Sequence, residues 1–386
     1  MQSYNFTKVF SAACLGMLVF GVVMLTLGSV LPDVMLKFNI DELAAGSLAS
    51  LLPLGILVGS IIFGPVVDKY SYKYFLIGCF ICVTVGMFGI AEAKAFVVLQ
   101  LAFFLIGIGG GGLNGATNAL VADISRAHQK KESVYLSALG IFFGVGALLV
   151  PSLLGLFTGI YDYEDILFFL SGGILILVIP LLFLEFPQPK LARRLPLVEG
   201  LRLFKNPALL VLASILFFHA AFEGVFNNWS TVFMERNKGL GQSQALACLS
   251  LYIGGLTVAR LFLVALFRVV RDEIILLTSI LLMMSALTLI IVSDGIGIIF
   301  LAVTLIGVGT AGIFPVILGY VSRLYDELRA TAIGVVIFLA VLGNILLNVI
   351  MGFLAKTMGI GAYQWLLAFC ICSVLVIVLL RKRTLN

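Results

Sequence analysis

The stretch "FVVLQLAFFLIGIGGGGLNGATNALV", residues 96–121, is apolar, rich in glycine and free of charged side chains. A helix needs about 20 mainly apolar residues to cross the hydrocarbon core of a bilayer, whereas a tilted barrel strand needs only about 10. A helix also satisfies every backbone amide within its own segment, which is required where no water is present. The stretch therefore predicts a membrane-spanning helix.

The same pattern recurs along most of the chain. Of its 386 residues, 62% are hydrophobic and 11% are charged, whereas about 25% of the residues of a soluble domain are charged. The first apolar stretch is longer than the core of a signal peptide, which has about 7 to 15 residues, so we expect it to be retained. We predict an all-α integral membrane protein with twelve transmembrane helices. The predicted spans are residues 9–31, 45–66, 73–92, 96–121, 133–157, 165–184, 207–233, 244–268, 273–292, 297–321, 330–353 and 361–380.

The distribution of basic residues predicts the orientation of the chain. With both termini in the cytoplasm, eighteen of the 24 Lys and Arg residues fall in inner loops and tails, five fall in outer loops, and Arg260 falls within a span. This bias follows the positive-inside rule. We therefore expect a multi-pass protein of the cell membrane, meaning the inner or plasma membrane, with both termini cytoplasmic. The net charge of +5 follows the same bias and needs no nucleic-acid partner.

A basic, polar connection divides the predicted spans into six and six. We expect an N-terminal half at residues 1–184, a cytoplasmic linker at 185–206 and a C-terminal half at 207–386. A repeat agrees with this division, because "LIGIGGGG" at 105–112 aligns with "LIGVGTAG" at 305–312, 200 residues further on. Two parallel six-helix halves around a midplane site are a transporter architecture.

The connection after the second predicted span reads "GPVVDKYSYKY", residues 64–74. It resembles the loop signature of the major facilitator superfamily, a family of transporters with this two-half fold. In that family the loop forms charge pairs that hold one conformation, so the resemblance implies a conformational latch here. Two positions depart from the signature, since Ser71 replaces a glycine and Tyr72 replaces a basic residue. The matching residues are Gly64, Asp68, Lys69 and Lys73.

Five further stretches are similar to one branch of that superfamily, the fucose, galactose and glucose symporters and their sodium-dependent glucose relatives. The resemblance implies a sugar as the substrate. Members of the sugar/proton branch often carry a carboxylate in the first span, but no ionisable residue occurs here between Lys8 and Asp33. The stretches are "GATNALVADISR" at 115–126, "FFGVGALLVPSLLG" at 142–155, "FEGVFNNWSTVF" at 222–233, "GGLTVARLF" at 254–262 and "GIFPVILGYVSR" at 312–323.

Glu223 is the one acidic residue that falls near the middle of a predicted span. A charged side chain at the bilayer centre costs about 2.5 to 3.5 kcal/mol, so such residues face the protein interior and commonly mark a pathway. We expect Glu223 to couple transport to a cation, either a proton or sodium, with His219 one helical turn away as its partner. The alternative is that Glu223 forms a static buried pair with Arg260.

Asparagines within the spans are candidates for binding a polar solute. Amides donate and accept hydrogen bonds, as a polyol requires, and an aromatic ring can cover the apolar face of a sugar. The alternative is that the asparagines join helices, at about 0.6 to 2 kcal/mol each. Including Glu223, the candidate substrate-binding residues are Asn114, Asn118, Glu223, Asn227, Trp229, Asn344 and Asn348.

These observations predict a secondary active transporter that moves a small polar organic solute, a sugar or polyol, by alternating access in symport with a cation. We expect it to work as a monomer in the lipid bilayer. The alternatives are an antiporter that exports amphipathic compounds, a uniporter, and a receptor or scaffold that does not transport. An enzyme is not expected, because the sequence offers no metal-ligand cluster and no nucleophile beside a base. No cofactor is expected either.

Overall fold

The computed structural model describes residues 4–130, 132–187, 203, 205–267, 269–325 and 329–380. Most of the predicted linker at 185–206 lies outside these residues. The side chains of Asp68 and Lys69 also lie outside the described part of the chain.

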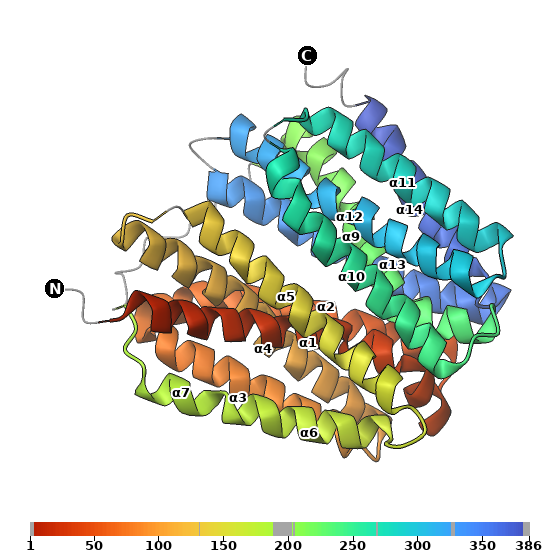
Figure 1. The fold of residues 1–386 in the computed structure, drawn as a ribbon, viewed down its shortest axis with the longest axis horizontal. Coiled ribbons are helices and arrows are strands. Elements are labelled where there is room, and N and C mark those ends of the chain that lie inside the picture. Colours follow the sequence, from red (N-terminus) through yellow and green to blue (C-terminus); the bar gives the residue numbers. More distant parts are fainter. Residues whose placement is uncertain are drawn as a thin grey trace. The chain divides into compact units, whose positions relative to one another are not determined.

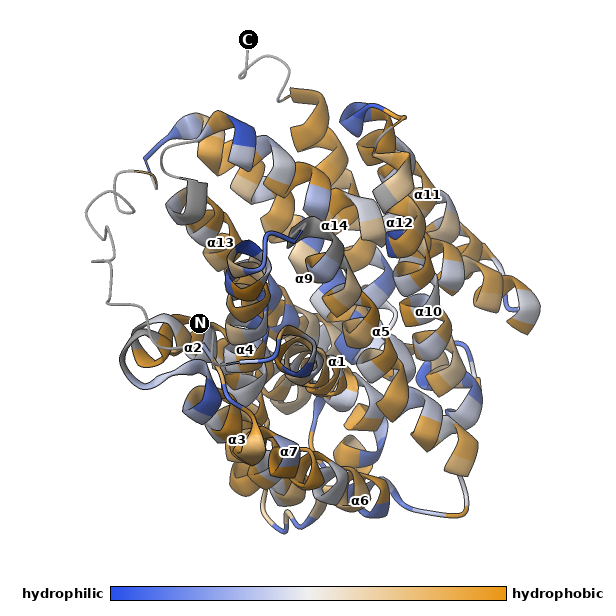
Figure 2. Ribbon diagram, turned by 60° about the vertical axis from the view of Figure 1, so that its left-hand side comes forward, coloured by the Kyte–Doolittle hydropathy of each residue, from blue (hydrophilic) through white to orange (hydrophobic). Residues whose placement is uncertain are grey.

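Within the described residues, every regular element is an α-helix (Figure 1). Twelve spans are long and apolar enough to cross a membrane, with α6 and α7 forming one span together. Hydrophobic residues cover the lengths of the helices, and hydrophilic residues gather mainly at helix ends and connections (Figure 2). The predicted fold class is therefore confirmed. The helices are α1 (Phe6–Lys37), α2 (Glu42–Tyr70), α3 (Tyr72–Ala91), α4 (Phe96–Ala127), α5 (Glu132–Phe157), α6 (Tyr163–Ile176), α7 (Val178–Phe183), α9 (Pro207–Arg236), α10 (Gln242–Leu266), α11 (Asp272–Val292), α12 (Ile296–Leu324), α13 (Arg329–Met358) and α14 (Ala362–Leu380).

The chain falls into two compact units, which we describe separately. The first unit contains residues 1–40 and 51–193, and the second contains residues 41–50 and 194–386. In the first unit α1 packs along α5 and α3 packs along α4. In the second unit α9 packs along α13, and both α10 and α11 pack along α12. The helix α2 begins in the second unit and continues in the first.

Glycines allow close helix contacts at equivalent positions of the two units. In the first unit, a Cβ added to Gly107 of α4 would overlap the carbonyl oxygen of Leu52 on α2. In the second unit, a Cβ added to Gly307 of α12 would overlap the carbonyl oxygen of Tyr252 on α10. Gly107 and Gly307 are 200 residues apart, and so are Leu52 and Tyr252. This is the offset of the sequence repeat. Since small residues let membrane helices approach closely, the repeat preserves helix packing as well as sequence.

A second equivalence joins the ends of two helix pairs. The Tyr72 hydroxyl of α3 donates a hydrogen bond to Oδ2 of Asp123 on α4, at 3.0 Å. In the other unit, Nη2 of Arg323 on α12 lies 2.6 Å from Oδ2 of Asp272 on α11. The two pairs are again 200 residues apart. A hydrogen bond between tyrosine and aspartate in the first unit thus corresponds to an ion pair between arginine and aspartate in the second unit.

Local sequence explains where α9 begins. Asn206 is the N-cap, and its side-chain oxygen accepts hydrogen bonds from the backbone N–H groups of Ala208 at 3.0 Å and Leu209 at 3.3 Å. Pro207 occupies the first helical position, where its missing N–H is not needed. These residues fix the start of the helix that carries Glu223.

Candidate transport site

One face of α9 is polar through the middle of the helix. His219, Glu223, Asn227 and Ser230 are spaced by four, four and three residues. At 100° per residue they lie within about 80° of one another around the helix axis. We call this set the polar face of α9.

His219 and Glu223 form a close pair on this face. Nε2 of His219 lies 3.9 Å from Oε2 of Glu223. The histidine side chain is 0% exposed and the glutamate side chain is 25% exposed. The separation is too long for a hydrogen bond, and the two side chains form an ion pair only when His219 is protonated. Neither ring nitrogen of His219 has a hydrogen-bond partner among the described residues.

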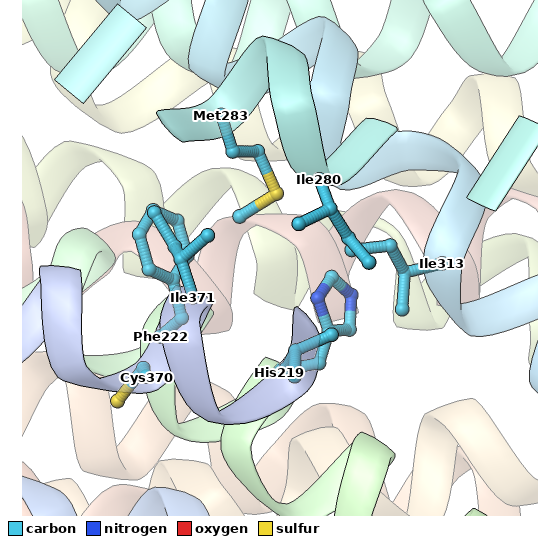
Figure 3. A pocket seen from close by; sticks show the side chains of 8 residues that line it. His219, Phe222, Ile280, Met283, Ile313, Cys370 and Ile371 are labelled. Carbon is cyan, nitrogen blue, oxygen red and sulfur yellow. The ribbon is translucent and has the colours of Figure 1, made fainter. Parts of the chain in front are cut away.

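The imidazole of His219 borders a small apolar cavity inside the second unit (Figure 3). The cavity has room for about one water molecule. Apart from His219, its walls carry only hydrocarbon and sulfur-containing side chains. They come from four helices and are Phe222, Ile280, Met283, Ile313, Cys370, Ile371 and Val374.

Tyr252 and Arg260 of α10 lie close enough to the His219–Glu223 pair to interact with it electrostatically. Glu223 and Arg260 both act electrostatically on His219 and on Tyr252. Tyr252 is fully buried, and its ring centroid lies 4.3 Å from that of Phe226 on α9. The structure thus brings Glu223, His219 and Arg260 into one cluster. Tyr252 was not predicted from the sequence, because a tyrosine in a span usually signals packing alone.

A different face of α9 is joined to α13 by a chain of amides. Nδ2 of Asn228 donates to Oδ1 of Asn348 at 3.1 Å. Nδ2 of Asn348 donates in turn to Oδ1 of Asn344 at 2.8 Å. Gly224 makes room for this contact, because a Cβ there would overlap the side chain of Asn344. This series of hydrogen bonds also extends to α2, where Nδ2 of Asn228 lies 3.5 Å from the carbonyl oxygen of Ala49.

Accessibility differs among the predicted substrate-binding residues of the second unit. Asn348 and Trp229 are 0% exposed, and Asn227 is 8% exposed. Asn344 is half-buried. In this structure Glu223 and Asn344 are therefore the accessible members, while Asn348 holds helices together and Trp229 packs in the core. Asn228 was not among the predicted binding residues, although its spacing of four from Gly224 places it on the α13 side.

The first unit supplies its own pair of amides. Nδ2 of Asn118 donates to the carbonyl oxygen of Asn114 at 2.8 Å and lies 3.1 Å from its Oδ1. Both residues are half-buried and lie one turn apart on α4. Unlike the hydrogen bonds of the amides on α9 and α13, these hydrogen bonds of Asn118 run within one helix.

The predicted latch is described only in part. Nζ of Lys73 donates to the carbonyl oxygen of Leu182 at the end of α7, at 2.6 Å. No atom of a neighbouring helix among the described residues lies within 4 Å of the position that a Cβ on Gly64 would occupy. Asp68 and Lys69 have side chains outside the described part of the chain, so their pairing stays a prediction.

The comparisons with known proteins identify the family. Residues 12–295 match the Major Facilitator Superfamily. Because the match covers more than half of the chain, the chain belongs to that superfamily. It is accordingly a multi-pass membrane protein that transports a small molecule, and the expectation that it is not an enzyme is confirmed.

Individual relatives are distant. The "Uncharacterized MFS-type transporter YfkL" of Bacillus subtilis (strain 168) is 23% identical over 353 residues, which cover 88% of this chain and 87% of that protein. A mutant of the nucleoside transporter NupG superposes with a TM-score of 0.82 at 16% identity, covering 99% of this chain and 100% of that one. The D-xylose-proton symporter superposes with a TM-score of 0.78 at 15% identity, covering 97% of each chain. At these identities, the structural likeness shows the fold.

Proposed function

We propose that this protein is a secondary active transporter that moves a sugar or a related polyol in symport with a cation. It works by alternating access, as a monomer in the cell membrane, with both termini in the cytoplasm. The observation that carries the proposal is the half-buried carboxylate of Glu223 in the middle of α9, 3.9 Å from a buried histidine. A carboxylate at this depth is costly, and residues of this kind commonly mark the path of an ion or a solute.

The accessible polar groups favour a polar solute. Asn114 and Asn118 in the first unit, with Glu223 and Asn344 in the second, offer donors and acceptors that a hydroxyl-rich molecule can use. We propose that the solute meets these groups as it crosses the bilayer. Asn227, Trp229 and Asn348 support them from buried positions.

Two comparisons support the sugar assignment. The sequence stretches that resemble the fucose, galactose and glucose branch cover spans in both halves. The D-xylose-proton symporter has the same fold over 97% of this chain. The latch at Gly64, Asp68, Lys69 and Lys73 then serves the conformational change, with Lys73 held at the end of α7.

Uptake into vesicles containing the purified protein tests this proposal. A panel of labelled sugars, polyols and nucleosides is offered under an imposed proton or sodium gradient, to wild type and to Glu223→Gln. We expect gradient-driven accumulation of one class of solute, lost in the variant while exchange of that solute across the membrane persists. Asp294→Asn, which removes a carboxylate that is 90% exposed in the same unit, is the matched control.

Three other outcomes would contradict the proposal. Unchanged uptake in Glu223→Gln would make Glu223 structural. Uptake that ignores both gradients would indicate a uniporter. Extrusion of amphipathic compounds without movement of any sugar would indicate an exporter.

A further inference from the structure

We propose that α2 is a hinged helix. Residues 41–50, which we call the docked segment, stay on the second unit, and the helix bends beside Pro53 when the two units move. The inference rests on the proposed function at one point, alternating access, because that mechanism moves the units against each other. It adds the place where the chain bends and the contacts that hold the docked segment.

The division between the two units falls inside α2. This helix is continuous from Glu42 to Tyr70, yet its residues up to Ser50 belong to the second unit and those from Leu51 onward belong to the first. Every other helix of the described chain lies within one unit. A movement of the units must therefore either bend α2 or detach the docked segment from the second unit.

The docked segment packs on α13 backbone to backbone. A Cβ added to Gly46 would lie 2.8 Å from the Cα of Gly352, and a Cβ added to Gly352 would lie 2.8 Å from the Cα of Gly46. Oγ of Ser50 lies 3.0 Å from the carbonyl oxygen of Ile345, within hydrogen-bond reach. Leu48 is fully buried. Contacts of this kind hold membrane helices together, so they resist detachment.

Two ion pairs lie at the start of the docked segment. Nζ of Lys356 on α13 lies 2.7 Å from Oδ2 of Asp41, and Nη1 of Arg236 on α9 lies 3.0 Å from Oε1 of Glu42. All four side chains are 26% to 48% exposed, so water screens the pairs and their contribution is small. The packing on α13 is therefore the main contact, and the pairs add a link to α9.

The following part of α2 has an equivalent contact within the first unit. A Cβ added to Gly55 would lie 2.9 Å from the Cα of Gly107 on α4, and the reverse distance is also 2.9 Å. α2 thus carries two glycines that approach another backbone, Gly46 toward α13 and Gly55 toward α4. Each contact holds its part of the helix to a different unit.

Pro53 lies between these two contacts. A proline has no N–H, and its ring pushes against the carbonyl four residues earlier, so the carbonyl of Ala49 receives no hydrogen bond along the helix. Nδ2 of Asn228 on α9 lies 3.5 Å from this oxygen, as a long replacement from the second unit. Sharp bends in helices commonly occur at proline. The counterpart 200 residues further on is Ile253, in α10, which lies wholly in one unit.

Distances between spin labels in lipid nanodiscs test the hinge without knowledge of the solute. A label at Leu43 of the docked segment is paired with one at Met358 on α13 or, in a second sample, with one at Val97 on α4. The three native side chains are exposed. Cys82→Ser and Cys372→Ser first remove the native thiols that are not buried. Each sample is measured alone and with each solute of the uptake panel.

The hinge predicts different behaviour for the two distances. Leu43 lies ten residues before Pro53, which is about 15 Å along the helix, so a bend of about 20° moves it sideways by about 5 Å. We expect the distance from Leu43 to Val97 to spread or shift by about this amount. The distance from Leu43 to Met358 should remain narrow, because both labels move with the second unit.

Variants of the hinge itself sharpen the result. Pro53→Ala restores the N–H that Ala49 lacks, so the spread of the distance from Leu43 to Val97 should fall by about half or more. Pro151→Ala is the matched control, because Pro151 lies inside α5, which belongs wholly to the first unit. It should leave both distances unchanged.

The outcomes separate the hinge from the proposed function. A varying distance from Leu43 to Met358 beside a fixed distance from Leu43 to Val97 would show that α2 moves as a rigid helix, and the hinge would be overturned. Two fixed distances would overturn it as well, because α2 would then not bend. A bending α2 in a protein that moves no sugar would support the hinge and contradict the choice of solute.

Discussion

Buried amides and accessible amides make different contacts in this protein. Asn348 is fully buried, yet it accepts a hydrogen bond from Asn228 and donates one to Asn344, so it links α9 to α13. Asn118 donates to Asn114 on its own helix and is half-buried. A buried amide that loses its partner retains the full cost of having left water.

Replacing Asn348 by Leu should therefore destabilise the protein by about 1 to 3 kcal/mol, because Asn228 loses the shorter of its two hydrogen bonds and Asn344 loses the donor to its Oδ1. The unfolding midpoint in detergent micelles measures this. Asn118→Leu is the control, since only a bond within one helix is lost. We expect it to leave the midpoint nearly unchanged and to reduce solute uptake. Equal losses of stability in the two variants would contradict the distinction.

Asp41 has an ion pair whose pH dependence can be derived. Its Oδ2 lies 2.7 Å from Nζ of Lys356, and its Oδ1 accepts a hydrogen bond from the N–H of Ala44 at 2.9 Å. The hydrogen bond from Lys356 is the main cause that lowers the pKa of Asp41, and the N–H of Ala44 adds to it. A carboxyl with a lowered pKa stabilises the folded protein above the unfolded pKa of about 3.9, and this stabilisation is lost as the pH falls through the folded pKa.

Asp41→Asn should lower the unfolding temperature at pH 7. The difference from wild type should shrink as the pH falls below about 3.9 and vanish below the lowered pKa of Asp41 in the folded protein. Asparagine still accepts the hydrogen bond from Ala44 in the first turn, so the variant isolates the ion pair. Lys356→Met should cause the same loss at pH 7. A difference from wild type that persists unchanged into acid would show that the effect does not come from the charge of Asp41.

At the scale of elements, glycines set how closely α1 and α5 approach. A Cβ on Gly146 of α5 would overlap the carbonyl oxygen of Leu18 on α1, and a Cβ on Gly21 of α1 would overlap that of Phe143. Backbone atoms cannot move aside as side chains do. Any side chain at either position must therefore push the two helices apart.

Gly146→Ala should destabilise the first unit by about 1 to 3 kcal/mol through this overpacking. Gly140→Ala on the same helix is a matched control, because no atom of another helix in the described part of the chain lies within 4 Å of the added Cβ. At position 140 the higher helix propensity of alanine should stabilise the folded protein by up to about 1 kcal/mol. Unfolding in urea or by heat in micelles compares the two. A loss at Gly140 as large as that at Gly146 would show that the contact with α1 is not the cause.

The membrane-spanning helices could be predicted from the sequence, but which side chains each helix directs toward its neighbours could not. Hydropathy and length are enough to find twelve spans, because lipid permits no other structure for such stretches. The direction of each side chain depends on which helices surround it. Asn227 and Asn228 are neighbours in sequence, yet Asn228 donates a hydrogen bond to Asn348 on α13, whereas Oδ1 of Asn227 has no partner among the described residues. Trp229 is fully buried instead of open to a sugar.

At the scale of the whole molecule, the ionisable cluster belongs to one unit, although the helix packing is repeated in both. Positions 200 residues before His219, Glu223, Tyr252 and Arg260 hold Val19, Val23, Leu52 and Ser60. The repeat thus preserved the glycines that pack helices and allowed the chemistry to diverge. If Glu223 couples transport to a cation, as proposed, that coupling belongs to the second unit.

The direction of α9 in the membrane decides which side of the bilayer Asn227 and Ser230 of its polar face lie nearer to. The positive-inside distribution predicts that Pro207 lies at the cytoplasmic end and Arg236 at the outer end, so Asn227 and Ser230 lie in the outer half. Green fluorescent protein fused after residue 200 should then fluoresce, and alkaline phosphatase fused after residue 239 should be active. Exchanging the two reporters is the control and should silence both. Active phosphatase after residue 200 would reverse the orientation, and Asn227 and Ser230 would then lie in the half of the membrane nearer the cytoplasm.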